Sequence, residues 1–451
     1  MDQLLPVLAV ASCAAVIFAL VSAIQRFSPR ELPWLVAGLV AHMAASFAVV
    51  AVTRAAYGSG DMFAYFYVAE SLQPALHLDF TGTVKELFIL IFHGRPVLPA
   101  HLFGVGSPTG TMIGVTTLID FAVGGSLYGT CLVIASISFF GKLALYIWGR
   151  ESFPERYRPR LAFGVLLVPT VVFWSGGIIK ESFAVAGIGF LALALHRILQ
   201  RRVVVGALIG LIGFGMVALI KPYLLFAFVM SAGAFLYARN ALSEANGHRL
   251  EIRPLHLVVA VALAVGGLIV LGKLFPNYSF ENIGAEAALQ QGAGAKVTGG
   301  SSYSIGDSNA TSLTGQLAFA PVGLIYSLFR PFIFEVRNVQ MAVNALEALA
   351  LTVLFFRVFW IRSWRASWRM LTSSPALIFA ATFVLIVGVG VGIATTNVGT
   401  LSRFRMPMMP FYAMLLLVMT IGPLPARKAE PEEVLPGKVT WLPNSRPEGN
   451  R

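Results

Sequence analysis

Long apolar segments recur along nearly the whole of this 451-residue chain, and they constrain its fold more than any other feature. Each is roughly 20 residues long, enough as α-helix to cross ~30 Å of hydrocarbon. We expect about eleven of them to be transmembrane helices. They cover residues 4–24, 33–56, 126–148, 161–179, 182–199, 203–220, 223–237, 255–275, 341–361, 375–395 and 406–421.

The composition places the chain among polytopic membrane proteins. Hydrophobic residues make up 57% of it, charged residues make up only 12%, and its mean hydropathy is +0.78, which excludes a water-soluble globule. The apolar segments lack the strict alternation of strands in a membrane β-barrel. The predicted fold is therefore all-α, a polytopic bundle of transmembrane helices.

Basic residues indicate the orientation of this bundle, because Lys and Arg accumulate in cytoplasmic connections. They fall on every second connection, which predicts an outer N-terminus and a cytoplasmic C-terminus. The net charge of +12 is spread over short turns and forms no stripe along which nucleic-acid phosphates would bind, so we expect no nucleic-acid partner. The series comprises Arg26, Arg30, Arg150, Arg156, Arg158, Arg160, Arg201, Arg202, Arg239, Arg249, Arg253, Arg362, Arg365, Arg369, Arg427 and Lys428.

The domain organisation follows from this orientation. Residues 1–425 form a single transmembrane domain, whose two long periplasmic connections are residues 57–125 and 276–340. Residues 426–451 are charged and rich in proline, which predicts a disordered cytoplasmic tail.

Both long outer connections have features beyond plain coil. In the first, residues 63–76 and 84–92 have helical spacing with aromatic faces, so we expect short helices that lie in the membrane interface. In the second, residues 292–314 are rich in Gly, Ser, Thr and Asn, which predicts a mobile loop. Such a loop either orders over a bound substrate or is a passive linker.

Ionisable residues gather where several apolar segments meet the outer side of the membrane. Such groups are costly at the edge of the hydrocarbon, so a cluster of them on one face predicts a functional site. Four short sequences supply them: Gly58-Ser59-Gly60-Asp61, Trp174-Ser175-Gly176-Gly177 with Lys180-Glu181, Arg330-Pro331 with Glu335, and Ser402-Arg403-Phe404-Arg405.

Asp61, Lys180 and Glu181 are the candidate catalytic residues. Asp61 lies at the membrane edge close to Tyr65, where partial desolvation would raise the basicity of its carboxylate toward a sugar hydroxyl. Capping the free N–H groups of an interfacial helix is the alternative role for Asp61. Lys180 and Glu181 lie at a tight turn, where the lysine would face an anion or the two would form a structural ion pair.

Tyr65, Lys221, Arg330, Glu335, Arg403 and Arg405 are the candidate substrate-binding residues. Guanidinium groups bind phosphate oxygens through paired hydrogen bonds and keep their charge, so several at the outer headgroup level favour a phosphate or diphosphate ligand. Snorkelling to lipid headgroups is the alternative for any single arginine.

Polar residues inside the apolar segments indicate less about the function. Glu347 needs a partner or a polar cavity, and Asn344 one turn earlier indicates that it faces the bundle interior. Cys13 and Cys131 lie in apolar segments and are expected to be packing residues. The seven histidines have no paired spacing on a helix face, so we predict no metal site and no cofactor.

A family resemblance rests on these residues. Asp61 soon after an early helix, tyrosines and interfacial helices in the first outer loop, and Arg403-Phe404-Arg405 before the final helix resemble the GT-C-fold glycosyltransferases, which use polyprenyl-phosphate-linked sugars on the outer face. The resemblance implies that Asp61 is the first-loop catalytic acid and that Arg403 and Arg405 lie near the lipid phosphate. Residues 168–181 and 329–335 also look like bacterial membrane proteins of polysaccharide loci.

These observations predict an inner-membrane glycosyltransferase that builds cell-surface polysaccharide from an undecaprenyl-phosphate-linked sugar. Its partners would be that donor, a glycan or lipid-linked acceptor, and membrane lipids. Asp61 would act as general base on the acceptor hydroxyl, while Lys180, Arg403 and Arg405 would stabilise the departing phosphate. The connection 276–340 would help to enclose the acceptor.

Three alternatives stay open. An O-antigen-type oligosaccharide polymerase or ligase has a similar number of helices, and its outer arginines hold a lipid diphosphate. A transporter of polysaccharide or lipid-linked sugar would use Lys180, Glu181 and Glu347 in a polar path, with ionisable groups near the bilayer midplane. A scaffold subunit of an assembly complex would leave the outer charges unclustered.

Overall fold

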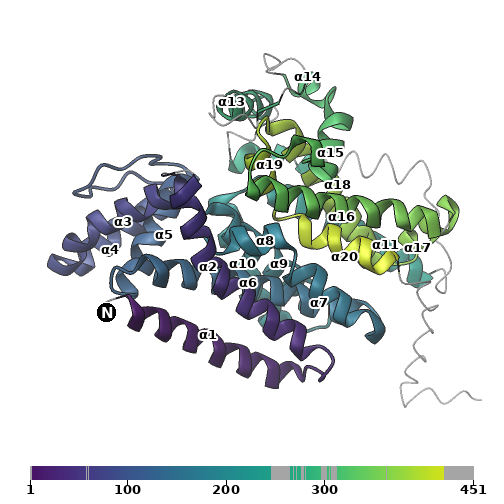
Figure 1. The fold of residues 1–451 in the computed structure, drawn as a ribbon, viewed down its shortest axis with the longest axis horizontal. Coiled ribbons are helices and arrows are strands. Elements are labelled where there is room, and N and C mark those ends of the chain that lie inside the picture. The colour runs from purple at the N-terminus through teal and green to yellow at the C-terminus, as the bar shows by residue number, and fades with distance from the viewer. Residues whose placement is uncertain are drawn as a thin grey trace, which may run out of the picture.

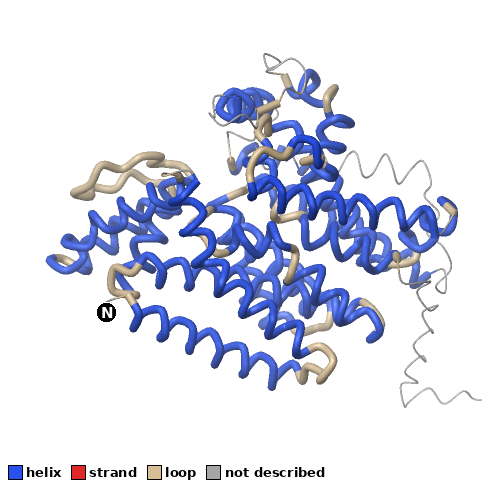
Figure 2. The backbone as a smooth tube through the Cα atoms, viewed as in Figure 1, coloured by secondary structure: helices blue, strands red, loops and turns tan. Residues whose placement is uncertain are grey.

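The computed structural model describes residues 3–420 of the chain except 57, 59, 245–264, 268, 271, 276–278, 280, 296–301, 304, 306–311 and 362. Within that part, eight helices are long and apolar enough to cross a membrane, so the chain is an all-α, multi-pass membrane protein (Figures 1 and 2). They are α1 (Leu4–Gln25), α2 (Leu32–Ala56), α6 (Leu127–Ser152), α9 (Lys180–Leu199), α10 (Val203–Ile220), α11 (Tyr223–Glu244), α16 (Val339–Ile361) and α18 (Pro375–Ala394).

The expected span 161–179 is not one helix. The structure has α7 (Arg158–Leu166) and α8 (Pro169–Ser175) instead, with an extended Val168 between them. Proline has no backbone N–H and disfavours helical geometry in the residue before it, so a helix ends ahead of Pro169 and a new one begins there.

Of the two other expected spans, one is shorter than predicted and the other lies mostly outside the described residues. The segment 406–421 contains only an 11-residue helix, α20 (Met409–Met419), which is preceded by turns. The segment 255–275 falls largely outside the described residues.

Helix α6 lies at the centre of the first half of the bundle, where it packs on α9, α2, α7 and α1. The contact with α9 is close enough to require glycine. A Cβ atom on Gly189 would lie 1.9 Å from the carbonyl oxygen of Gly141, so neither helix tolerates a larger residue there. The two helices therefore form one rigid pair, and α10 covers the other side of α9.

The second half of the bundle packs around α18. This helix contacts α11, α15 (Ala320–Phe329) and α20. Aromatic rings join the two halves: the ring of Trp148 in α6 lies 5.3 Å from that of Phe379 in α18 and 6.3 Å from that of Phe411 in α20, measured between centroids. The apolar core is thus continuous from α1 to α20.

The connection 57–125 folds into three helices that lie together at one side of the bundle (Figure 1). They are α3 (Asp61–Leu78), α4 (Phe80–Ile91) and α5 (Pro108–Ala122). The predicted helices 63–76 and 84–92 are confirmed within α3 and α4, whereas α5 was not expected. Buried Asp120 attaches this unit to α6, because its carboxylate accepts hydrogen bonds from Gln73 and from Thr130 of α6.

The connection 276–340 contributes α13 (Ile283–Ala295), α14 (Leu313–Leu317), α15 and a 3-10 turn, η3 (Ile333–Glu335). Its described part packs on the segment before α19 (Val398–Phe404): the amide of Tyr303 donates to the carbonyl of Thr396, and the Thr396 hydroxyl donates to the carbonyl of Gln291. Most of the predicted mobile loop 292–314 and the tail 426–451 lie outside the described residues.

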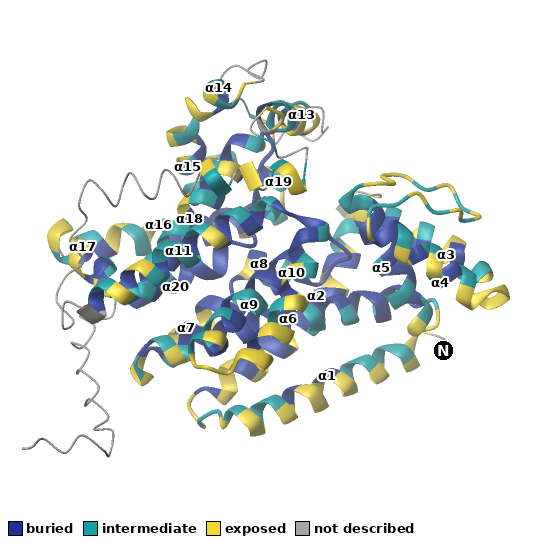
Figure 3. Cartoon of the chain, turned by 180° about the vertical axis from the view of Figure 1, so that it is seen from behind, coloured by how far each residue is buried: buried dark blue, intermediate teal, exposed yellow. Residues whose placement is uncertain are grey.

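Charged side chains gather at the two ends of the bundle. At one end the carboxylate of Glu31 pairs with Arg150 and Arg158, and Glu151 pairs with Arg197. This end also carries η1 (Glu155–Tyr157), while α17 (Trp364–Thr372) follows α16. Between the ends, many residues of α1 are exposed (Figure 3), and the large side chains among them are apolar. Such a surface is what a helix presents to lipid.

Candidate functional site

At the opposite end of the bundle, the starts of α3 and α9, the turn after α10, and α19 bring four charged side chains into one contact chain. Arg403 donates from Nη1 to the Asp61 carboxylate over 2.9 Å. Its Nε lies 3.6 Å from a carboxylate oxygen of Glu181. The same oxygen accepts a hydrogen bond of 2.8 Å from Lys221 Nζ. We call Asp61, Lys180, Glu181, Lys221 and Arg403 the charge cluster.

The charge cluster runs from solvent into the protein. The Asp61 side chain is 52% exposed and Arg403 is 24% exposed, whereas Glu181 and Lys221 are 2% and 7% exposed. Asp61 is therefore the carboxylate that an incoming ligand can reach, and Glu181 lies beneath it between two cations. Three cations face two carboxylates here, which leaves one positive charge in excess for an anionic ligand.

Local sequence explains how Glu181 reaches this place. Gly176, at the end of α8, lies against α2 so closely that a Cβ atom would be 2.4 Å from the backbone of Ala45. The chain then turns and begins α9 at Lys180, which places Glu181 in the first turn. A carboxylate is favourable there because the free N–H groups of a helix start carry partial positive charge.

Lys180 extends the charge cluster toward α5. Its Nζ donates to the Thr109 hydroxyl over 2.8 Å, and it interacts electrostatically with Asp61, Glu181 and Arg403. It is the cation of the cluster that is bound to a hydroxyl and not to a carboxylate.

Tyr65 lies beside Thr109 and Asp61. It is buried and its ring stacks on Phe103 with 6.1 Å between centroids. Burial, and then the negative charge of Asp61, raise the pKa of the Tyr65 phenol far above its ordinary value. The phenol therefore stays protonated at physiological pH and is available as a hydrogen-bond donor.

Lys221 is enclosed by aromatic rings as well as by Glu181. Its Nζ lies 4.1 Å from the centroid of the Phe404 ring and 5.8 Å from that of Tyr223. Burial alone would lower the pKa of Lys221, but the Glu181 carboxylate outweighs it and the pKa is raised. The pKa of Arg403 is raised in the same way, against burial, by Glu181 and Asp61. The cluster thus keeps both cations charged.

Arg330 and Glu335 form a separate group. Arg330 donates from Nε to both carboxylate oxygens of Glu335 over 2.8 and 3.0 Å, and its Nη2 pairs with the same carboxylate. The guanidinium lies 3.8 Å from the ring centroid of Tyr303 and 4.6 Å from that of Tyr326. Arg330 therefore directs its charge to Glu335 and the tyrosines and not to Asp61.

Arg405 is fully buried behind α19. Its Nη1 donates to the carbonyl of Arg330 over 2.6 Å, and its Nη2 lies 3.7 Å from Glu347. Glu347 in turn accepts a 2.6 Å hydrogen bond from the amide of Thr170 in the first turn of α8. These contacts hold α8 and α19 to α16.

The sequence-predicted residues thus divide into two groups. The structure brings Asp61, Tyr65, Lys180, Glu181, Lys221 and Arg403 together, and it places Arg330, Glu335 and Arg405 in the neighbouring network. The capping alternative for Asp61 does not hold: Asp61 is the first residue of α3, Gly60 is its N-cap, and no side chain caps that helix. Glu347 and Asn344 are buried in the bundle, as expected.

Two further residues, Thr109 and Lys142, are not predicted from the sequence. Thr109 was treated as part of a loop, although Ser107-Pro108 is a typical helix start and the Ser107 hydroxyl does accept from the Thr109 amide. Lys142 was overlooked inside an apolar segment, where an ionisable residue is itself a signal.

Lys142 lies near the middle of α6 and is completely buried. Its Nζ donates to the Ser175 hydroxyl, which also accepts from Ser138. Within the described part of the chain it pairs with no carboxylate. His42 of α2 lies nearby and has one ring nitrogen, Nε2, without a partner among the same residues.

In the ranges that the structure describes, no three His, Cys, Asp or Glu side chains come together in a group that could hold a metal ion. A comparison of the chain with known protein families, with curated proteins and with solved structures finds no match.

Proposed function

We propose that this protein is an inner-membrane glycosyltransferase that transfers a sugar from a polyprenyl-phosphate carrier during the synthesis of cell-surface polysaccharide. One observation carries the proposal: a solvent-accessible carboxylate, Asp61, is held by Arg403 beside an excess of positive charge at the membrane edge. Transfer from a lipid-linked sugar needs these two functions side by side, a base for the acceptor and cations for the phosphate. In this proposal the cluster faces the periplasm.

The proposed step uses Asp61 as general base. The acceptor hydroxyl attacks the anomeric carbon and gives its proton to the Asp61 carboxylate. The bond between that carbon and the phosphate oxygen breaks, and its electron pair leaves with the phosphate. Lys180 and Arg403 stabilise the charge that develops on the departing oxygen, since both cations lie next to the base.

Glu181 and Lys221 act as positioning residues in this proposal. Both are almost inaccessible, and their ion pair fixes the side of Arg403 that faces away from Asp61. Arg405 is proposed to hold α19 through the carbonyl of Arg330, which leaves the phosphate to Arg403 and Lys180. Tyr65 would donate from its phenol to a sugar or phosphate oxygen.

An O-antigen-type polymerase or ligase is the closest alternative. The same cations would then hold a lipid diphosphate, and the acceptor would be a second lipid-linked oligosaccharide or a glycolipid. The charge cluster suits both reactions, so the two are separated by the acceptor that supports turnover.

A transporter of lipid-linked sugar or polysaccharide is the alternative from another class. It is favoured by Lys142 and His42, which are buried near the middle of the bundle, where a translocation path requires polar groups. Under that alternative, movement of the substrate across a bilayer would depend on Lys142, and Asp61 would be dispensable for it.

The test is a transfer assay with the purified full-length protein and a panel of undecaprenyl-phosphate-linked hexoses and lipid-linked oligosaccharides. We expect transfer by the wild type and a loss of about 100-fold or more in D61N, as for removal of a general base. E70Q is the matched control, because Glu70 is an exposed carboxylate on the same helix. Transfer by D61N at the wild-type rate would remove Asp61 from the mechanism and the proposal with it.

A further inference from the structure

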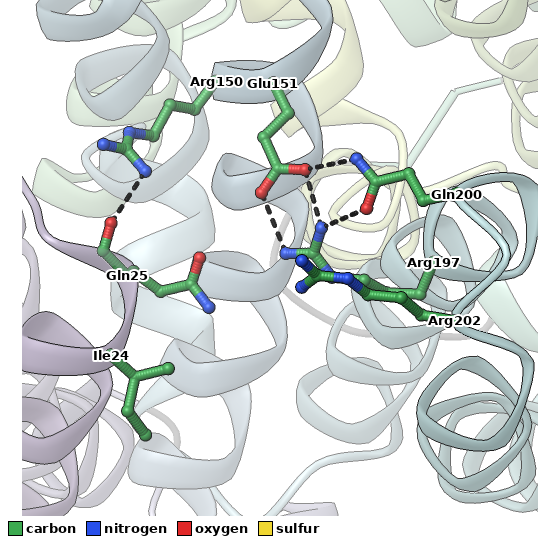
Figure 4. Close-up of a pocket in the computed structure, with 7 residues that line it drawn as sticks. All are labelled: Ile24, Gln25, Arg150, Glu151, Arg197, Gln200 and Arg202. Atoms are coloured by element: carbon green, nitrogen blue, oxygen red, sulfur yellow. Dashed lines mark hydrogen bonds and ion pairs between the residues drawn. The ribbon is translucent and has the colours of Figure 1, made fainter. Parts of the chain in front are cut away.

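A polar cavity lies at the end of the bundle opposite the charge cluster (Figure 4). Its volume is about 440 Å³. It is lined by Gln25 of α1, Arg150 and Glu151 of α6, Arg197 of α9, and Gln200 and Arg202 of the turn into α10. Three guanidinium groups and one carboxylate face it, so the lining carries two positive charges in excess.

Two of the three arginines already have partners. Arg197 donates to both oxygens of Glu151 over 2.7 and 2.8 Å. Arg150 donates from Nη1 to the carbonyl of Gln25 over 3.1 Å, while its Nε pairs with Glu31 at 2.9 Å. These contacts hold both guanidinium groups in place on the cavity wall.

Arg202 differs from them. Its side chain makes no hydrogen bond or ion pair to any residue that the structure describes, and Figure 4 shows it at the cavity beside Arg197. A cation that is free on a wall of fixed cations is placed to bind an anion.

The position of the cavity indicates what kind of anion. Gln25 is the last residue of α1, Arg150 and Glu151 belong to the last turn of α6, and α10 begins directly after Arg202. The cavity therefore lies at the level where several spans leave the hydrocarbon, which is the level of the lipid headgroups.

The cavity also has an apolar side toward the lipid. Ile24, the remaining lining residue, is 75% exposed, and the exposed side chains of Leu20 and Ile17 continue this stripe along α1. An acyl chain can follow the stripe while its phosphate enters the cavity. A soluble phosphate compound has no acyl chain and would make no contact with this stripe.

We propose that this cavity binds the phosphate of an anionic phospholipid, with Arg202 as the direct ligand and Arg150 and Arg197 as fixed neighbouring charges. Basic recesses between transmembrane helices are suited to such headgroups because the guanidinium groups form charge-assisted hydrogen bonds with phosphate oxygens. The inference does not depend on the proposed glycosyl transfer.

The test measures thermal unfolding of the delipidated full-length protein in neutral detergent while cardiolipin, phosphatidylglycerol, phosphatidylcholine or inorganic phosphate is added. We expect the two anionic lipids to raise the wild-type midpoint in a saturable way. In R202Q the apparent Kd for these lipids should rise about tenfold or more, as expected for loss of a charge-assisted contact. R201Q is the matched control, since Arg201 is exposed and lies outside the cavity.

Three results would overturn the proposal. Equal lipid dependence of R202Q and the wild type would show that the cavity is not the binding site. An equal effect of phosphatidylcholine would remove the charge selectivity. Saturable stabilisation by inorganic phosphate alone, lost in R202Q, would assign the cavity to a soluble phosphate compound and not to a lipid.

Discussion

The Arg403 guanidinium donates to the Asp61 carboxylate over 2.9 Å, although 342 residues separate the two in the sequence. The contact joins the first residue of α3 to α19, just before the last helix of the bundle. Glu181 and Lys221, from the middle of the chain, complete the cluster beneath it. Elements from the whole length of the transmembrane domain are thus required to build one small polar region.

Sugar transfer should be sensitive even to a substitution of Arg403 that keeps the positive charge. R403K retains a cation but loses the fork that reaches Asp61 and Glu181 at once. Loss of a hydrogen bond between charged groups costs about 1.5–3 kcal/mol, so we expect transfer to fall by roughly 10- to 100-fold. The measurement is the initial rate with a polyprenyl-linked donor in the variants R403K and R95K.

Arg95 is the control because it is an exposed arginine of the connection 57–125 and lies outside the charge cluster. If R403K and R95K transferred sugar at the same rate, the Arg403 contact would have no part in the reaction.

Glu181 should matter for stability more than for chemistry. E181Q leaves Lys221 and Arg403 facing a neutral amide in a buried place. Removing one partner of a buried ion pair costs roughly 3–5 kcal/mol, whereas replacing both partners by apolar residues costs far less. We therefore expect a large fall in the free energy of unfolding for E181Q and a smaller one for the double variant E181M/K221M, measured by denaturation in mild detergent.

The double variant decides between two readings of the pair. Equal destabilisation of E181Q and E181M/K221M would mean that Glu181 acts alone and not through Lys221.

Much of the bundle can be predicted from the apolar segments. Segment length and composition identify the eight long spans, and Glu347 with Asn344 correctly indicates a buried face of α16. A hydropathy window does not detect the break at Pro169, because the residues on both sides of it are apolar. Pro169 itself is the sequence signal of that break, because the residue before a proline disfavours helical geometry.

The grouping of charges is harder to predict than the spans. The sequence predicts that Arg330, Arg403 and Arg405 lie on one side of the membrane. It does not indicate which of these arginines is paired with another residue of the protein. The Arg330 guanidinium is paired with Glu335 of the following 3-10 turn. The Arg405 guanidinium donates to the backbone carbonyl of Arg330. The Arg405 contact joins residues 75 apart in the sequence, and no local pattern predicts it.

Glu31 provides a pH-dependent prediction. Burial alone would raise its pKa, but hydrogen bonds from Tyr146 and Ser28 and the charges of Arg150 and Arg158 outweigh this, so the pKa is lowered. A lowered carboxyl pKa contributes stability that is present above the unfolded-state pKa, about 4.3, and is lost as the pH falls through the folded value. We expect the melting temperature of the wild type to decline in that acidic range.

E31Q should behave differently in two ways. At pH 7 it should be less stable by roughly 3–5 kcal/mol, because two arginines lose a buried partner. Below pH 4 its stability should change less than that of the wild type. An unchanged acid response in E31Q would mean that Glu31 is not the group that titrates.

A variant of Lys142 distinguishes the proposed glycosyltransferase function from that of a transporter. The Lys142 amino group is completely buried with hydroxyl groups around it, and burying a polar group without full hydrogen bonding costs about 1–3 kcal/mol. Methionine has a similar length and no such cost. If Lys142 has no role in the reaction, K142M should be more stable than the wild type by roughly that amount and should transfer sugar at a rate within about twofold of it.

The decisive comparison is between transfer in detergent and substrate movement across liposomes, each measured for K142M and D61N. The proposed glycosyltransferase requires that D61N abolish transfer and that K142M leave it intact. The opposite pattern, with substrate movement lost in K142M and kept in D61N, would assign the function to the buried centre of α6 and make the charge cluster at the membrane edge a structural ion-pair network.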